Sequence, residues 1–74
     1  MIELSAIRRE AGVTQAEMAA RLAMTQSSVS QLERRSDVLV STLSEYLNAL
    51  GAHGRITITI GDVEFEHDLT GEQR

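Results

Sequence analysis

The amino-acid sequence predicts a mainly α-helical fold of four short helices followed by a C-terminal β-hairpin. Apolar residues recur with helical spacing in successive short segments as far as Leu50. After Gly54 the spacing of apolar residues changes to two, which is typical of strands. The chain has 74 residues, 42% of them hydrophobic and only 3% aromatic, so its single small core is expected to be aliphatic.

The first helix is predicted from an apolar repeat at i, i+3 and i+7, formed by Leu4, Ile7 and Ala11. Gly12 is suited to end it in the left-handed conformation. Thr14 and Glu17 then have the spacing of a capping box, in which each side chain bonds the backbone N–H of the other. This pattern predicts a second helix from Gln15 to Leu22.

A third helix, Gln26 to Arg34, follows after a short turn at Ala23 and Met24, with Thr25 as its N-cap. Val29 and Leu32 are its only large apolar residues, so it needs the preceding helix as a platform. Most of its surface is covered by short or uncharged polar side chains.

We predict a loop over residues 34–40 and a fourth helix capped by Ser41 or Thr42; Glu45, three residues after Thr42, favours Thr42. The apolar repeat of this helix is Leu43, Tyr46, Leu47 and Leu50. Gly51 is expected to end it.

Gly61 and Asp62 suit a type II′ hairpin turn. If they form the loop, Ile60 pairs with Val63, Ile58 with Phe65 and Ile56 with His67. The opposite face then pairs Thr59 with Glu64, Thr57 with Glu66 and Arg55 with Asp68. This register sorts the apolar side chains onto one face. Residues 70–74 are predicted to fray. We divide the chain into a helical domain over residues 1–51 and a β-hairpin tail over residues 52–74.

The composition excludes several chemistries. The chain has no cysteine, which rules out disulfides and thiolate zinc sites, and its two histidines are 14 residues apart. Glu64, Glu66 and Asp68 fit one exposed strand face better than a metal site or an acid catalyst. We therefore expect no metal, no cofactor and no enzymatic activity. No apolar run could span a membrane and no signal peptide is evident, so we expect a cytoplasmic protein.

Negative charge is concentrated in the tail. The net charge is −4; residues 1–50 carry five arginines and six acidic residues, whereas residues 51–74 carry two arginines and five acidic residues. All seven basic residues are arginine, and Arg8, Arg9, Arg34 and Arg35 flank the ends of the helical segment. Any DNA binding must therefore depend on local placement rather than on a basic field.

The third helix has side chains suited to the major groove of double-stranded DNA. A glutamine amide donates and accepts at once, which matches adenine, and serine reaches bases or phosphates at short range. Helix N-termini also attract phosphates, here at Gln15 and Gln26. The alternative is a solvated helix face, with arginines that complement the helix dipole. Our candidate DNA-binding residues are Gln15, Thr25, Gln26, Ser27, Ser28, Ser30, Gln31, Arg34 and Arg35.

This segment resembles the helix-turn-helix of the phage-repressor and Cro superfamily, the XRE-type regulators. The resemblance lies in Gln15, Ala19, Val29 and the pair Leu32-Glu33. It implies that Gln15 contacts a phosphate, that residues 26, 27, 28 and 31 face the groove, and that Glu33 pairs with Arg8. One departure is Ala23, which occupies a turn position where the family has glycine. If that turn needs a positive φ, alanine costs about 1 kcal/mol relative to glycine.

From Leu39 onward the chain resembles HigA-type antitoxins of type II toxin–antitoxin systems. This resemblance implies a repressor of its own operon whose acidic tail neutralises a small basic toxin. A phage or mobile-element regulator with no toxin partner is the alternative.

The apolar face of the hairpin must be covered, because a lone hairpin is marginal in water. Its members are Ile56, Ile58, Ile60, Val63 and Phe65. They form either an intramolecular core or a dimer interface, and we favour a symmetric homodimer. Two-fold symmetry would place the third helices of the two copies, which are the recognition helices, one DNA turn, about 34–36 Å, apart.

Overall fold

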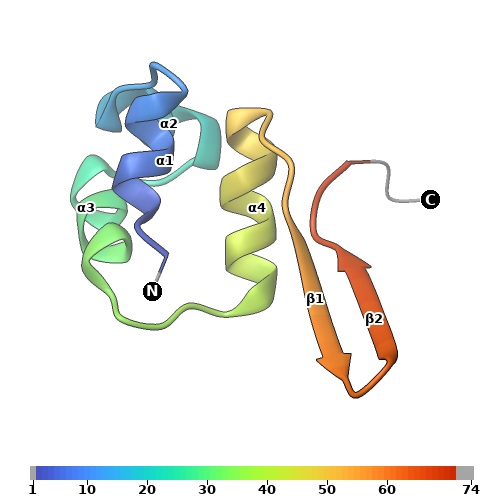
Figure 1. Ribbon diagram of the computed structural model, residues 1–74. Coiled ribbons are helices and arrows are strands. Elements are labelled where there is room, and N and C mark those ends of the chain that lie inside the picture. Colours follow the sequence, from blue (N-terminus) through green and yellow to red (C-terminus); the bar gives the residue numbers. More distant parts are fainter. Residues whose placement is uncertain (1, 72–74) are drawn as a thin grey trace.

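The computed structural model describes residues 2–71 and contains the predicted four helices and one hairpin. The helices are α1 (Leu4–Glu10), α2 (Gln15–Leu22), α3 (Gln26–Arg34) and α4 (Val40–Leu50). The strands are β1 (Arg55–Ile60) and β2 (Val63–Asp68). The hairpin lies on one side of α4, with β1 as its nearer strand, and the other three helices lie on the opposite side (Figure 1). The predicted fold class is confirmed.

The start of α2 has the predicted capping box. The Thr14 hydroxyl accepts a hydrogen bond from the Glu17 backbone N–H at 3.0 Å, and the Glu17 carboxylate accepts one from the Thr14 N–H at 2.8 Å. Gly12 has the left-handed conformation expected after α1, with φ +75°. Local sequence signals therefore define the boundary between the first two helices.

The cap predicted for α4 is wrong. The helix begins at Val40, its N-cap is Leu39, and no side chain caps it, so Ser41 and Thr42 lie inside its first turn. Val38 is partly buried against the core, and the Leu43 N–H already bonds the Leu39 carbonyl at 2.9 Å. Because Val38 packs against the core, α4 begins before Ser41 and Thr42. This packing outweighs the capping preference of those two residues.

The core lies where α1, α2, α3 and α4 meet. Met18, Val29 and Tyr46 are completely buried at its centre. Leu4 and Ala19 complete it from α1 and α2, and α2 packs against both α3 and α4. The side of α3 that carries Val29 therefore packs into the core, and the opposite side faces outward.

The hairpin has the predicted register at all six positions, from Arg55 opposite Asp68 to Ile60 opposite Val63. Gly61 has φ +58°, whereas Asp62 is not among the residues with positive φ, as a type II′ turn requires. At its base, the Leu69 N–H donates to the Gly54 carbonyl at 2.9 Å.

The prediction that residues 70–74 fray is wrong for Thr70. Thr70 and Leu69 are only 7% and 5% exposed. The Thr70 hydroxyl accepts from the Gly54 N–H at 3.1 Å, and the Ser44 hydroxyl donates to the Leu69 carbonyl. These bonds close the base of the hairpin and attach it to α4. Residues 72–74 of the predicted tail lie outside the described residues.

Candidate nucleic-acid interface

The turn between α2 and α3 sets the angle at which α3 leaves the domain. Ala23 adopts the left-handed conformation, with φ 57° and ψ 44°. This geometry lets the Met24 N–H bond the Ala19 carbonyl at 2.9 Å and so close the end of α2. Thr25 then caps α3 by accepting from the Ser28 N–H at 3.0 Å. The turn therefore requires a positive φ at Ala23, the position where glycine would be expected.

The outward surface of α3 is polar, as predicted. Among the nine candidate DNA-binding residues, those exposed to solvent are Thr25, Gln26, Ser27, Gln31, Arg34 and Arg35. The partly buried ones are Gln15, Ser28 and Ser30. The Ser28 hydroxyl accepts from the Thr25 hydroxyl at 2.9 Å, so this pair is engaged in the helix cap. The structure brings these residues together on one helix-turn-helix unit, and their contact with DNA stays a prediction.

The predicted pair between Arg8 and Glu33 is present and nearly buried. The Arg8 Nε donates to Glu33 Oε2 at 2.7 Å and its Nη2 donates to Oε1 at 3.2 Å, so the contact is bidentate. Their side chains are 9% and 4% exposed. The Arg8 Nη1 also bonds the Val13 carbonyl at 2.9 Å. The pair joins α1 to the end of α3.

Two further donors complete the environment of Glu33, and no sequence pattern indicates either of them. The Tyr46 hydroxyl donates to Oε2 at 2.6 Å, and the Gln15 side-chain amide donates to Oε1 at 3.1 Å. The Gln26 amide in turn donates to Gln15 Oε1 at 3.5 Å. Tyr46 occupies a core position of α4, and its apolar spacing revealed burial but not the partner of its hydroxyl.

The ionisation of this cluster follows from burial and hydrogen bonding. Burial acts to raise the pKa of Glu33, but the hydrogen bonds from Arg8, Tyr46 and Gln15 outweigh it and hold the pKa below its usual value. The hydrogen bond to Glu33 raises the pKa of Arg8. Burial, reinforced by the hydrogen bond to the carboxylate, raises the pKa of Tyr46 well above its usual value. Glu33 is therefore ionised and Tyr46 is a neutral donor at neutral pH.

The apolar face of the hairpin is left uncovered by the helices of the same chain. Ile58, Ile60, Val63 and Phe65 are 53%, 66%, 54% and 57% exposed, whereas Ile56 is partly buried. The predicted alternative of an intramolecular core therefore does not describe this face within residues 2–71.

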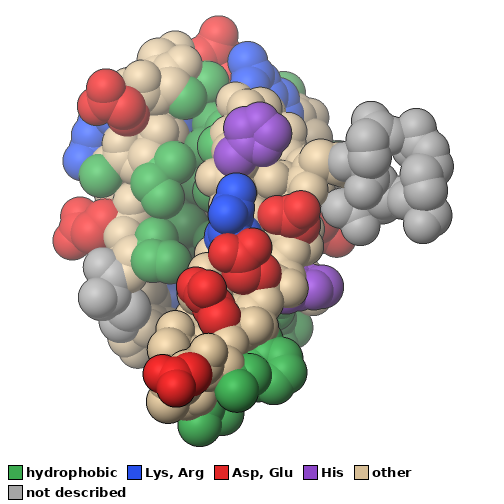
Figure 2. Space-filling view, turned by 45° about the vertical axis from the view of Figure 1, so that its right-hand side comes forward, with side chains coloured by type: hydrophobic (Ala, Val, Ile, Leu, Met, Phe, Trp, Pro, Cys, Tyr) green, Lys and Arg blue, Asp and Glu red, His purple; other side chains and the backbone are tan. Residues whose placement is uncertain are grey.

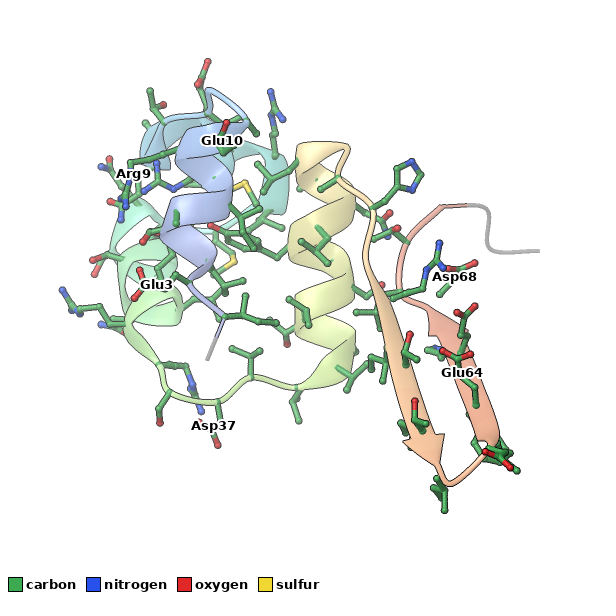
Figure 3. All side chains as sticks on the ribbon, viewed as in Figure 1. Glu3, Arg9, Glu10, Asp37, Glu64 and Asp68 are labelled. Carbon is green, nitrogen blue, oxygen red and sulfur yellow. The ribbon has the colours of Figure 1, made fainter. Side chains whose placement is uncertain are left out.

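The opposite face of the hairpin is acidic. Figure 2 shows acidic side chains in a row along the hairpin, with hydrophobic side chains at its lower end. Glu64 and Asp68 project from β2, the strand farther from α4 (Figure 3). Glu66 lies 3.6 Å from Arg55 in an exposed ion pair, and Asp68 is the cross-strand partner of the same arginine, whereas Glu64 lies opposite Thr59.

Within residues 2–71, no three histidine, cysteine or acidic side chains gather in a way that could hold a metal ion. None of the helices in this range combines the length and hydrophobicity needed to cross a bilayer.

Comparisons with known proteins agree with this geometry. A family model described as helix-turn-helix matches residues 4–55. A solved HigA antitoxin, for which induced DNA bending by a unique dimerization is described, is 35% identical, with a TM-score of 0.78 over 90% of this chain and 93% of that chain. A DNA-bound antitoxin HigA3 is 34% identical, with a TM-score of 0.80 over 100% of this chain and 96% of that chain. No curated protein sequence matches the chain. From the match over residues 4–55 and the likeness along the whole chain, we conclude that this protein belongs to the helix-turn-helix family and has the fold of the HigA antitoxins.

Proposed function

We propose that this protein is a sequence-specific DNA-binding repressor that acts as a dimeric antitoxin of a type II toxin–antitoxin system and represses its own operon. The observation that carries the proposal is the exposed polar face of α3, held outward by the buried Val29. It is supported by a fold that two HigA structures share along nearly their whole length. This role involves binding without catalysis, in the cytoplasm beside the nucleoid.

In this proposal the N-terminal half of α3 enters the major groove. Gln26 and Ser27 stand at the helix start, the end that contacts base edges in helix-turn-helix proteins, and Gln31 lies about one turn further along. A glutamine amide can make two bonds to adenine. Arg34 and Arg35, exposed at the other end of α3, supply phosphate contacts. Since the chain has a net charge of −4, these local contacts must provide the affinity.

A second copy of the chain covers the apolar face of the hairpin. An exposed apolar face on the order of several hundred Å² is typical of an interaction surface. The hairpin lies across α4 from α3, so a copy bound there leaves the recognition helix free (Figure 1). A dimer has two recognition helices, and the second compensates for the weak binding of a single helix to DNA.

The acidic face of the hairpin is the proposed contact for a small basic toxin. Glu64, Glu66 and Asp68 are all exposed on it, and opposite charge speeds the encounter of two proteins in a salt-dependent way. A phage or mobile-element regulator would use the same α3 and have no such partner.

The DNA-binding assignment is tested with duplexes selected from a random pool by the wild-type protein. Gln26→Ala with Gln31→Ala should abolish the preference for the selected duplex over a scrambled one in gel shifts, while circular dichroism stays unchanged. Ser41→Ala with Glu45→Ala removes two polar side chains from α4 that are also exposed, and it should leave that preference intact. Undiminished preference in the folded glutamine variant would refute the groove assignment.

The toxin contact is better tested by charge reversal than by truncation. Removing residues 54–74 would strip the buried Leu69 from α4 and disturb the helices as well. Glu64→Lys with Glu66→Lys alters only exposed side chains and should abolish binding to the protein encoded by the adjacent gene. Glu45→Lys on α4 is the control. If the doubly reversed hairpin still binds that partner with wild-type affinity, the acidic face is not the contact.

A further inference from the structure

A chain of hydrogen bonds runs from the core to the start of the recognition helix. Tyr46 in α4 donates to Glu33 at the end of α3 at 2.6 Å. Gln15 at the start of α2 donates to the other oxygen of that carboxylate at 3.1 Å. Gln26 at the start of α3 donates to the Gln15 carbonyl oxygen at 3.5 Å. Three helices thus meet in one polar path.

The direction of every bond in this path is set by the carboxylate. An ionised carboxylate only accepts hydrogen bonds, so the Gln15 amide must turn its nitrogen toward Glu33. Its oxygen then points toward α3, and the Gln26 amide must present its own nitrogen to that oxygen. The orientation of both glutamine amides therefore follows from the charge and position of one buried side chain.

Tyr46 fixes the position of that carboxylate. Arg8 bonds both oxygens, whereas Tyr46 bonds only Oε2 and Gln15 only Oε1. Together these four bonds occupy about all the lone-pair sites that a carboxylate offers. Without the Tyr46 hydroxyl, Oε2 keeps only its donor from Arg8, and Arg8 alone sets the plane of the carboxylate. The oxygen that accepts from Gln15 is then held less firmly.

We propose that Tyr46 is a positioning residue for DNA recognition: through Glu33 and Gln15 it holds the Gln26 amide in a single orientation for a base. With its nitrogen directed toward Gln15, Gln26 keeps its oxygen and its second N–H for the groove. That pairing of acceptor and donor on one edge matches adenine N6 and N7. Gln31 takes part in none of the bonds of this path, so its contribution should not depend on Tyr46.

This inference rests on the proposed DNA binding, and a double-mutant cycle tests it. Binding to the selected duplex is measured for Tyr46→Phe, Gln26→Ala and their combination, and for the matching set with Gln31→Ala. In the wild-type background Gln26→Ala should weaken binding about tenfold or more, as expected for a glutamine–adenine contact. In the Tyr46→Phe background the loss should be at least threefold smaller, whereas the loss caused by Gln31→Ala should be unchanged.

Ser44→Ala provides the matched control, because it also removes a hydroxyl from α4 but one that bonds the hairpin at Leu69. It should leave the effect of Gln26→Ala at the wild-type value. A Tyr46→Phe protein in which both glutamine substitutions keep their full effects would overturn the proposal, since a merely structural tyrosine lowers stability without singling out Gln26.

A second measurement separates this proposal from the proposed function. In the DNA-free protein, nuclear magnetic resonance should show a slowly exchanging Gln15 side-chain amide that becomes solvent-like in Tyr46→Phe and not in Ser44→Ala. If the wild-type protein selects no duplex, DNA binding fails, and this measurement still decides the hydrogen-bonded path. An unchanged Gln15 amide in Tyr46→Phe would refute the path.

Discussion

Replacing Ala23 by glycine should stabilise the protein, although glycine usually destabilises. Ala23 has φ 57° and ψ 44°, and it is the only non-glycine residue with positive φ among residues 2–71. The left-handed conformation costs an L-residue about 1–2 kcal/mol. Glycine removes that cost but loses about 0.5–1 kcal/mol more backbone entropy on folding. Since Ala23 is exposed and its methyl group is not part of the core, the net gain is about 0.5–1 kcal/mol.

The assay is thermal unfolding followed by circular dichroism. A gain of this size corresponds to a rise in the unfolding temperature of about 4 °C for a domain of this length. Ala20→Gly is the matched control, because Ala20 is also exposed but lies inside α2, where glycine should lower stability by about 1 kcal/mol. If Ala23→Gly lowers the unfolding temperature as Ala20→Gly does, the turn does not hold the strain assigned to it.

Three further stability predictions follow from the capping box and the buried cluster. Glu33→Gln should cost about 3 kcal/mol in urea unfolding, because it leaves the charge of Arg8 buried without its partner, whereas Glu64→Gln on the exposed hairpin should change little. The pKa of Glu33 is lower in the folded than in the unfolded state, so its stabilising contribution is complete above pH ~4.3 and is lost as pH falls through the folded pKa. The difference in urea midpoint between wild type and Glu33→Gln should therefore be constant from pH 7 to 5 and should shrink below pH ~4.3; a difference that grows on acidification would contradict this sign. Thr14→Ala should cost about 1 kcal/mol by removing the capping box, and an unchanged urea midpoint would show that the box contributes nothing.

The hairpin shows what sequence patterns determine well. Alternation with a period of two permits a single register that places Ile58 and Phe65 on the same face, because a slip of one residue would turn every side chain over. Gly61 supplied the turn type independently. The capping box at Thr14 and Glu17 was equally predictable, since both residues act within one turn of the chain.

The sequence-based predictions fail where packing between residues distant in the chain determines the local structure. The cap of α4 was misplaced because Val38 packs into the core, a contact that no local pattern shows. Thr70 was expected to fray because it follows the last strand in a polar segment, yet it bonds Gly54, 16 residues earlier. Both are contacts between residues that only the folded chain brings together.

The candidate site likewise has one part that local patterns predict and one part that depends on contacts between distant residues. The polar face of α3 follows from its two apolar anchors, because Val29 and Leu32 fix which side must face outward. The hydrogen bond from Tyr46 to Glu33 joins residues from different helices, and a tyrosine at a core position gives no sign of where its hydroxyl points. The sequence could therefore predict the outward polar surface of α3 but not the hydrogen bonds that lie behind it.

The most direct test of the account is whether the wild-type protein binds two half-sites one DNA turn apart. Fluorescence anisotropy titrations would compare the selected duplex with one in which about five base pairs, half a helical turn, are inserted between its half-sites. A dimer joined through the hairpin should lose most of its affinity for the lengthened duplex, because its second α3 then faces the wrong side of the DNA. Equal affinity for both duplexes would contradict the paired recognition helices on which the account depends.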